Sequence, residues 1–138
     1  MNRPFDEPSQ FRVRAEAAAV LEILQGVAMG EYGMISSAIL DWEVSKNPYP
    51  HKQFEIQKIL TLATSYIDQG VNITTRARAL CALGFRSYDA LHLASAEESA
   101  ANCFLTTDDK LLKLAAKHSE DINVPVMNPV QWIWNQMT

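Results

Sequence analysis

The chain has 138 residues, of which 48% are hydrophobic and 20% are charged, and its formal net charge is −4. These values predict one globular domain over residues 1–138 with a single substantial core. The acidic balance argues against nucleic-acid binding through overall charge, but it allows a local basic rim around an acidic pocket. No apolar run approaches the length of a membrane span, and the polar N-terminus is not typical of a signal peptide.

The first predicted helix runs from Ser9, as its N-cap, to about Met29, and Gly30 is the expected stop. Apolar side chains at helical spacing predict its buried face: Val13, Ala17, Val20, Leu21, Leu24 and Val27.

A short apolar run at residues 33–36 predicts a strand, and residues 37–46 predict a helix that ends before Pro48. A further helix is expected over residues 53–66. Its predicted buried side consists of Phe54, Ile56, Ile59, Leu60 and Ala63.

Residues 71–73 are either a minor strand or a lead into the helix predicted at 75–83, which stops at Gly84. Small residues predict a helix over 87–101, and residues 103–106 predict a short buried strand. Cys81 and Cys103 lie in apolar sequence without metal-ligand spacing, so we expect reduced core cysteines of a cytoplasmic protein.

The last part of the chain repeats the pattern. We expect a helix at 110–117, a strand at 124–127 and a final helix that begins at Pro129. Helices that alternate with short apolar strands predict the α/β class, with a mostly parallel sheet flanked by helices.

Three carboxylates carry the predicted chemistry. Glu43, Asp89 and Asp108 each lie near the start of a helix that follows a predicted turn at the sheet edge. Because open α/β folds bind ligands at the carboxyl edge of the sheet, Asp89 and Asp108 are expected to face one cleft. Carboxylate oxygens are the ligands that Mg²⁺ and Mn²⁺ prefer, and such an ion can activate water against a phosphodiester.

Each residue also has a purely structural interpretation. Asp89 in a first helical turn can be a cap or dipole partner, and Asp108 with Asp109 makes a good N-cap pair. Asp41 could replace Glu43 in any functional role. His92, one turn after Asp89, could line the same cleft or could be a hydrogen-bonded packing residue.

Two tryptophans and five cationic residues also have both a structural and a functional interpretation. Trp132 and Trp134 suit a core or a dimer face. Five cations could rim a cleft or be ordinary solvated surface: Lys46, Lys52, Arg76, Arg78 and Arg86. An unrelated α/β hydrolase built on the same acids would need a nucleophile motif, and the sequence contains none.

Several motifs together resemble the PIN domain family. The run YDALHLASA at 88–96, followed by FLTTDDKLL at 104–112, is similar to the C-terminal half of PIN domains. The segment 37–48, with Glu43 before Val44, is similar to the middle acidic motif of the family. The ending Val-Met-Asn-Pro at 126–129 also resembles the family.

This resemblance implies a three-layer α/β/α sandwich and a ribonuclease that depends on Mg²⁺ or Mn²⁺. It further implies an RNA substrate, a homodimer and, for toxins of the virulence-associated-protein-C type, an antitoxin partner. Matched residue by residue, Glu43, Asp89 and Asp108 correspond to three metal-binding acids. Asp109 corresponds to an accessory acid, and Thr106 to a supporting hydroxyl.

One departure concerns the start of the chain. Residues 2–6 resemble a segment that follows the first strand in one PIN subgroup, so we expect the first strand and its acid to be absent. Either the start is assigned too far downstream or the protein is shortened. We then expect weak metal binding, and a partner chain could cover the gap by strand addition. The alternative function is a catalytically degenerate PIN module that binds RNA or a protein partner.

Overall fold

The computed structural model describes residues 8–137, except for the side chains at positions 8, 9 and 43. The segment 2–6 therefore lies outside the described residues. Within them the elements, in chain order, are α1 (Pro8–Ala28), β1 (Ile35–Ser37), α2 (Ala38–Ser45), α3 (Pro50–Leu60), β2 (Ser65–Ile67), α4 (Val71–Ala82), α5 (Ser87–Glu98), β3 (Phe104–Leu105), α6 (Asp109–Lys117), β4 (Val126–Met127) and α7 (Pro129–Met137). None of these helices combines the length with the apolar character needed to cross a bilayer.

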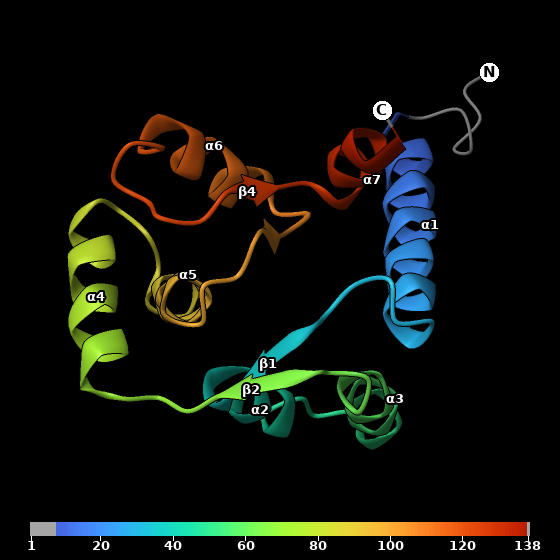
Figure 1. The fold of residues 1–138 in the computed structure, drawn as a ribbon, viewed down its shortest axis with the longest axis horizontal. Coiled ribbons are helices and arrows are strands. Elements are labelled where there is room, and N and C mark those ends of the chain that lie inside the picture. The colour runs from blue at the N-terminus through green and yellow to red at the C-terminus, as the bar shows by residue number, and fades with distance from the viewer. Residues whose placement is uncertain (1–7, 138) are drawn as a thin grey trace.

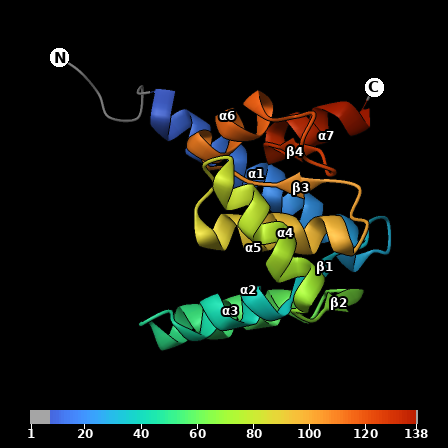
Figure 2. The ribbon, with the colours of Figure 1, turned by 90° about the vertical axis from the view of Figure 1, so that its left-hand side faces the viewer.

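The strands pair in parallel, which confirms the predicted α/β class. β1 pairs with β2 and β3 pairs with β4, so the described strands form two separate two-stranded sheets. Figures 1 and 2 show β1 and β2 beside α2 and α3 at one end of the molecule, with α6, α7 and β4 at the other. The three-layer sandwich around one sheet stays a prediction.

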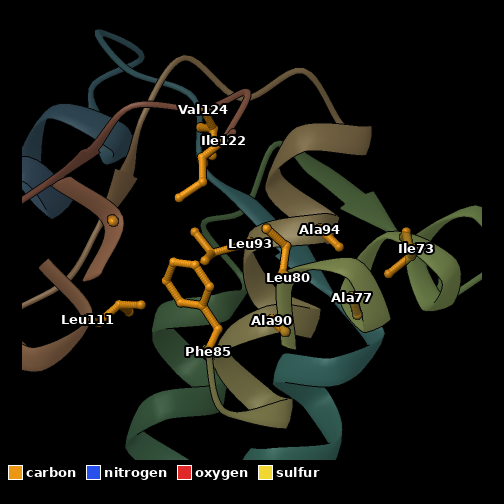
Figure 3. Close-up of a cluster of buried hydrophobic side chains, with 11 residues drawn as sticks. Ile73, Ala77, Leu80, Phe85, Ala90, Leu93, Ala94, Leu111, Ile122 and Val124 are labelled. Atoms are coloured by element: carbon orange, nitrogen blue, oxygen red, sulfur yellow. The ribbon is translucent and has the colours of Figure 1, made fainter. Parts of the chain in front are cut away.

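The core is centred on the packing of α4 against α5. Leu80 of α4 and Leu93 of α5 are completely buried, and Phe85 lies between the two helices in the chain and joins the same cluster (Figure 3). Alanines such as Ala77 and Ala90 let the helix backbones approach closely. Each buried leucine contributes about 1.5–3 kcal/mol through removal of apolar surface from water.

Glycines end two of the helices, as the sequence predicts. Gly30 after α1 has a φ of 82°, and Gly84 after α4 has a φ of 114°. Residues with a Cβ rarely adopt this left-handed region, so glycine is the residue that closes a helix there without strain.

The segment 61–67 differs from the prediction. The expected helix over 53–66 ends at Leu60, and residues 65–67 form β2. Residues 71–73 begin α4, which confirms the alternative that they lead into the next helix. The backbone N–H groups of Thr64 and Ser65 donate to the carbonyl oxygen of Met34, at 2.8 and 3.3 Å. Pairing with β1 therefore overrides the local helical pattern.

The predicted buried face of α1 is only partly correct. Val27 is buried as predicted, but Val13 and Leu21 are 62% and 58% exposed, and Ala19, which lies outside the predicted face, is buried. Helix α1 lies alongside α7 (Figure 1), and Gly26 faces the ring of Tyr32. A Cβ at Gly26 would come within 2.5 Å of that ring. The Tyr32 ring in turn contacts that of Trp132 in α7, with centroids 4.8 Å apart, so packing against Tyr32 and α7 buries a stripe that hydrophobic periodicity identifies only in part.

Three smaller expectations of burial are also wrong. Helix α3 contains no buried residue, and Phe54 and Ile59 are exposed on it. Cys81 is exposed, because α4 turns its other face toward α5. Cys103 is half-buried, and burial raises the pKa of its thiol.

Candidate functional site

The turn between β1 and α2 positions the first predicted acid. The hydroxyl oxygen of Ser37 accepts a hydrogen bond from the backbone N–H of Leu40 at 3.2 Å, which is the geometry of an N-cap. Ser36 and Ser37 are buried at this turn. Helix α2 therefore starts at the end of β1, and Glu43 lies in its second turn.

An open pocket of about 400 Å³ lies where α2 approaches the start of α5. Its lining residues come from these two helices and from the residues that directly flank them: Trp42, Lys46, Arg86, Tyr88 and Asp89. Asp89 is half-buried in the first turn of α5, where the helix dipole favours a carboxylate. The pocket thus places one carboxylate beside two cations.

Two aromatic rings form the wall of this pocket. The rings of Trp42 and Tyr88 contact each other with centroids 5.3 Å apart and an angle of 35° between their planes. The ammonium of Lys46 lies over the Trp42 ring, 5.1 Å from its centroid, in a cation–π contact. The pocket therefore offers both positive charge and exposed aromatic surface.

Asp108 follows β3 by three residues and caps α6. Its carboxylate accepts hydrogen bonds from the backbone N–H groups of Lys110 at 2.9 Å and Leu111 at 3.3 Å. The hydroxyl oxygen of Thr106 accepts from the backbone N–H of Asp108 at 3.1 Å. The N-cap role of Asp108 is confirmed, and Thr106 supports the segment that carries it.

Asp109 is held by an arginine from α1. Both terminal nitrogens of Arg12 lie 2.6 Å from the Asp109 carboxylate, and its Nε donates to Glu16 at 2.9 Å. Glu16 also accepts from the side-chain amide of Asn128 at 2.6 Å. The guanidinium lowers the pKa of Asp109, and the two carboxylates raise the pKa of Arg12.

Comparison with known proteins decides the family. The family model of the PIN domain matches residues 10–117, which is most of the chain. The chain belongs to the PIN domain family. No curated protein and no solved structure matches it. PIN domains are generally nucleases that use divalent metal ions, and the matched range contains every predicted site residue of this chain.

The structure of this PIN domain brings only some of the predicted site residues together. Thr106 contacts Asp108, whereas the pocket at Asp89 is lined by neither Asp108 nor Asp109. His92 is half-buried one turn after Asp89, on the same helix. Whether the acids share one cleft stays a prediction.

The predicted acids fit a divalent cation in chemistry but only partly in arrangement. Carboxylate oxygens have the right chemistry for Mg²⁺ or Mn²⁺. The side chain of Glu43 is not among the described ones. Among those that are described, no group of three or more residues drawn from Asp, Glu, His and Cys lies close enough together to hold a metal ion. The described acids therefore have suitable ligand atoms for Mg²⁺ or Mn²⁺, but by themselves they do not form a complete metal site.

Sequence reasoning missed the aromatic wall and the role of Arg12. A signal for the wall was present, since an aromatic residue directly precedes each of two predicted acids: Trp42 precedes Glu43, and Tyr88 precedes Asp89. Arg12 contacts Asp109 across 97 positions of sequence, and no local pattern indicates this pairing.

Proposed function

We propose that this PIN domain is a divalent-metal-dependent endoribonuclease. The observation that carries the proposal is the pocket that joins Asp89 to the cations of Lys46 and Arg86. A phosphodiester is anionic, so a carboxylate alone would repel it. Two adjacent cations offset that repulsion and let the backbone of RNA approach.

The roles of the acids follow from their elements. Glu43 on α2, Asp89 on α5 and Asp108 at the start of α6 would hold Mg²⁺ or Mn²⁺, with Asp109 as an accessory acid. When bound, such an ion supplies Lewis acidity and a water of lowered pKa for hydrolysis. Thr106 would fix the backbone of Asp108, and His92 would line the cleft.

The chain's own charges prepare the site before any ligand enters. Asp108 stays anchored through the two N–H groups that it caps, so its carboxylate has a fixed place at the start of α6. Arg12 keeps Asp109 ionised. For Asp109 to act as an accessory ligand, its carboxylate has to exchange this guanidinium for the cation.

The biological setting is part of the proposal. PIN domains bind RNA and often act beside antitoxin proteins, and we propose a cytoplasmic toxin that pairs with an antitoxin and forms a homodimer. The exposed apolar residues of α1, which include Val13, Val20 and Leu21, support a protein partner, because apolar patches of this kind commonly mark interfaces.

A second candidate is a catalytically degenerate PIN module that binds RNA or a protein. The pairing of Asp109 with Arg12 favours it, since a guanidinium already neutralises one predicted acid. This candidate keeps the cationic and aromatic pocket but predicts no Mn²⁺-dependent cleavage, even at high protein concentration.

The deciding experiment measures cleavage of a single-stranded RNA oligonucleotide in Mn²⁺ and in EDTA. We expect cleavage in Mn²⁺ only, and an Asp89→Asn variant slower by about 100-fold or more, the scale of losing one positioned electrostatic group. Glu120→Gln, an exposed acid away from the pocket, is the charge-matched control and should cleave normally. Cleavage that persists in EDTA would contradict the mechanism.

A further inference from the structure

Two aromatic side chains beside a candidate catalytic acid remain partly open to solvent. Trp42 is 43% exposed and Tyr88 is 46% exposed, although their rings contact each other. Large aromatic side chains usually gain stability by burial, so a paired and half-exposed set suggests a surface kept for a ligand. Lys46, Arg86 and Asp89 complete this pocket.

We propose that the pocket binds one unpaired nucleotide of the RNA substrate. The base stacks on the exposed aromatic surface of Tyr88 and Trp42, and the adjoining phosphates are bound by Lys46 and Arg86. This inference rests on the proposed nuclease function and deepens it, because it assigns two aromatic residues of this chain as the groups that position one nucleotide of the substrate.

The ring geometry limits how a base can bind. With centroids 5.3 Å apart, the rings of Trp42 and Tyr88 already touch, so a base has to add to the outside of the pair. Lys46 lies over Trp42, which directs the base toward Tyr88 and leaves the ammonium near the phosphate. Tyr88 directly precedes Asp89, so a stacked nucleotide lies next to the acid.

The chemistry selects single strands over duplexes. In an A-form duplex the base faces are stacked on one another, and proteins contact mainly phosphates and 2′-hydroxyls. A single strand can present a base face to an aromatic ring, and stacking of this kind tolerates any base. The pocket therefore predicts cleavage at unpaired positions with little preference for base identity.

The test measures binding without cleavage, by fluorescence anisotropy of a labelled ten-nucleotide oligouridine in EDTA. Tyr88→Ala should weaken binding by about 5- to 150-fold, and Trp42→Ala should weaken it by a smaller factor, whereas Tyr88→Phe should retain it. The same variants should bind a strand of abasic nucleotides as the wild type does. Replacing Lys46 and Arg86 by glutamine should reduce the salt dependence, by about 0.7 in log–log slope for each lost phosphate contact.

The chain offers a matched control on α3. Phe54 is also exposed and also lies under a lysine, with Lys58 placed 5.3 Å from its ring centroid, but neither residue lines the pocket at Asp89. Phe54→Ala should leave oligouridine binding unchanged. If the Tyr88→Ala variant does not fold, Tyr88→Leu can replace it in the binding test, because leucine keeps an apolar side chain without an aromatic ring. Tyr88→Leu should also weaken oligouridine binding.

Several results would overturn the inference. They are wild-type affinity in the Tyr88 and Trp42 variants, equal binding of abasic and natural strands, or tighter binding of duplex than of single-stranded RNA. Failure of the nuclease proposal is a separate outcome. Oligouridine binding that depends on Tyr88, without any cleavage in Mn²⁺, would keep the nucleotide pocket and refute the enzyme. Cleavage in Mn²⁺ that is unaffected by Tyr88→Ala would keep the nuclease proposal and refute the nucleotide pocket.

Discussion

Arg12 and Asp109 form a two-point ion pair, in which both terminal nitrogens of the guanidinium lie 2.6 Å from the carboxylate. The pair joins α1 to the first turn of α6, and these segments are 97 positions apart in the sequence. It also occupies a carboxylate that we propose as an accessory metal ligand. The same contact therefore bears on both the fold and the chemistry.

The first prediction concerns the stability that this pair contributes. Arg12→Gln and Asp109→Asn should each lower the melting temperature, and the double variant should lose less than the sum of the two, because they remove one shared interaction. The losses should shrink in 1 M salt. Arg14→Gln, on the same exposed helix, is the control and should melt like the wild type. Additive losses would show that the pair contributes no coupling.

The second prediction concerns pH. Arg12 holds the pKa of Asp109 below its ordinary value of about 3.9, so the unfolded chain binds a proton more readily than the folded chain does. The stabilisation by this carboxylate is therefore complete above about pH 4–5 and is lost as the pH falls through the lowered pKa. The difference in melting temperature between wild type and Asp109→Asn should be constant near pH 6 and should shrink as the pH falls below about 4. A pH-independent difference would contradict this assignment.

The third prediction separates the two roles of Asp108. Asp108→Ala removes the N-cap of α6 and should reduce the free energy of unfolding by about 0.5–2 kcal/mol. Asp108→Asn keeps an oxygen that can accept from the backbone N–H groups, so its stability should stay near that of the wild type. Urea unfolding measures both. If Asp108→Asn is as unstable as Asp108→Ala, the charge and not the cap stabilises the helix.

The fourth prediction concerns the hydrogen bonds of Glu97, at the end of α5. Glu97 accepts from Arg76 at 2.7 Å and from the backbone N–H of Asn123 at 2.9 Å, and its side chain is only 8% exposed. Glu97→Ala leaves both donors without this partner. It should therefore reduce the free energy of unfolding by about 2–4 kcal/mol, somewhat below the cost for a fully buried pair because Arg76 is 31% exposed.

The neighbouring residue provides the control for this network. Glu98 is exposed on the same helix, and Glu98→Ala should change the free energy of unfolding by no more than about 0.5 kcal/mol. If urea unfolding gives equal changes for the two variants, the hydrogen bonds of Glu97 do not contribute measurably to the free energy of unfolding.

Features encoded locally could be predicted from the sequence. The stops at Gly30 and Gly84, the Asp108 cap and the start of α7 at Pro129 each depend on the conformational preference of one residue. The α/β class follows from the alternation of helices and short strands. These signals act within a few residues, so neighbours in space do not alter them.

Features that depend on distant partners could not be predicted. Val13 and Leu21 fit a helical stripe, yet α1 turns another stripe toward α7. Residues 65–67 pair with β1 although their sequence continues a helical pattern. In the candidate site, the acids could be named from their motifs, but the contact of Trp42 with Tyr88 and that of Arg12 with Asp109 both cross between elements.

The central claim is that acids from α2, α5 and the start of α6 hold one cation together. Calorimetric titration with Mn²⁺ tests it most directly, using Glu43→Gln, Asp89→Asn and Asp108→Asn, with Glu120→Gln as the control. We predict that each of the three variants weakens Mn²⁺ binding by about tenfold or more, while the control binds like the wild type. Equal Mn²⁺ binding by all four variants would contradict a shared site.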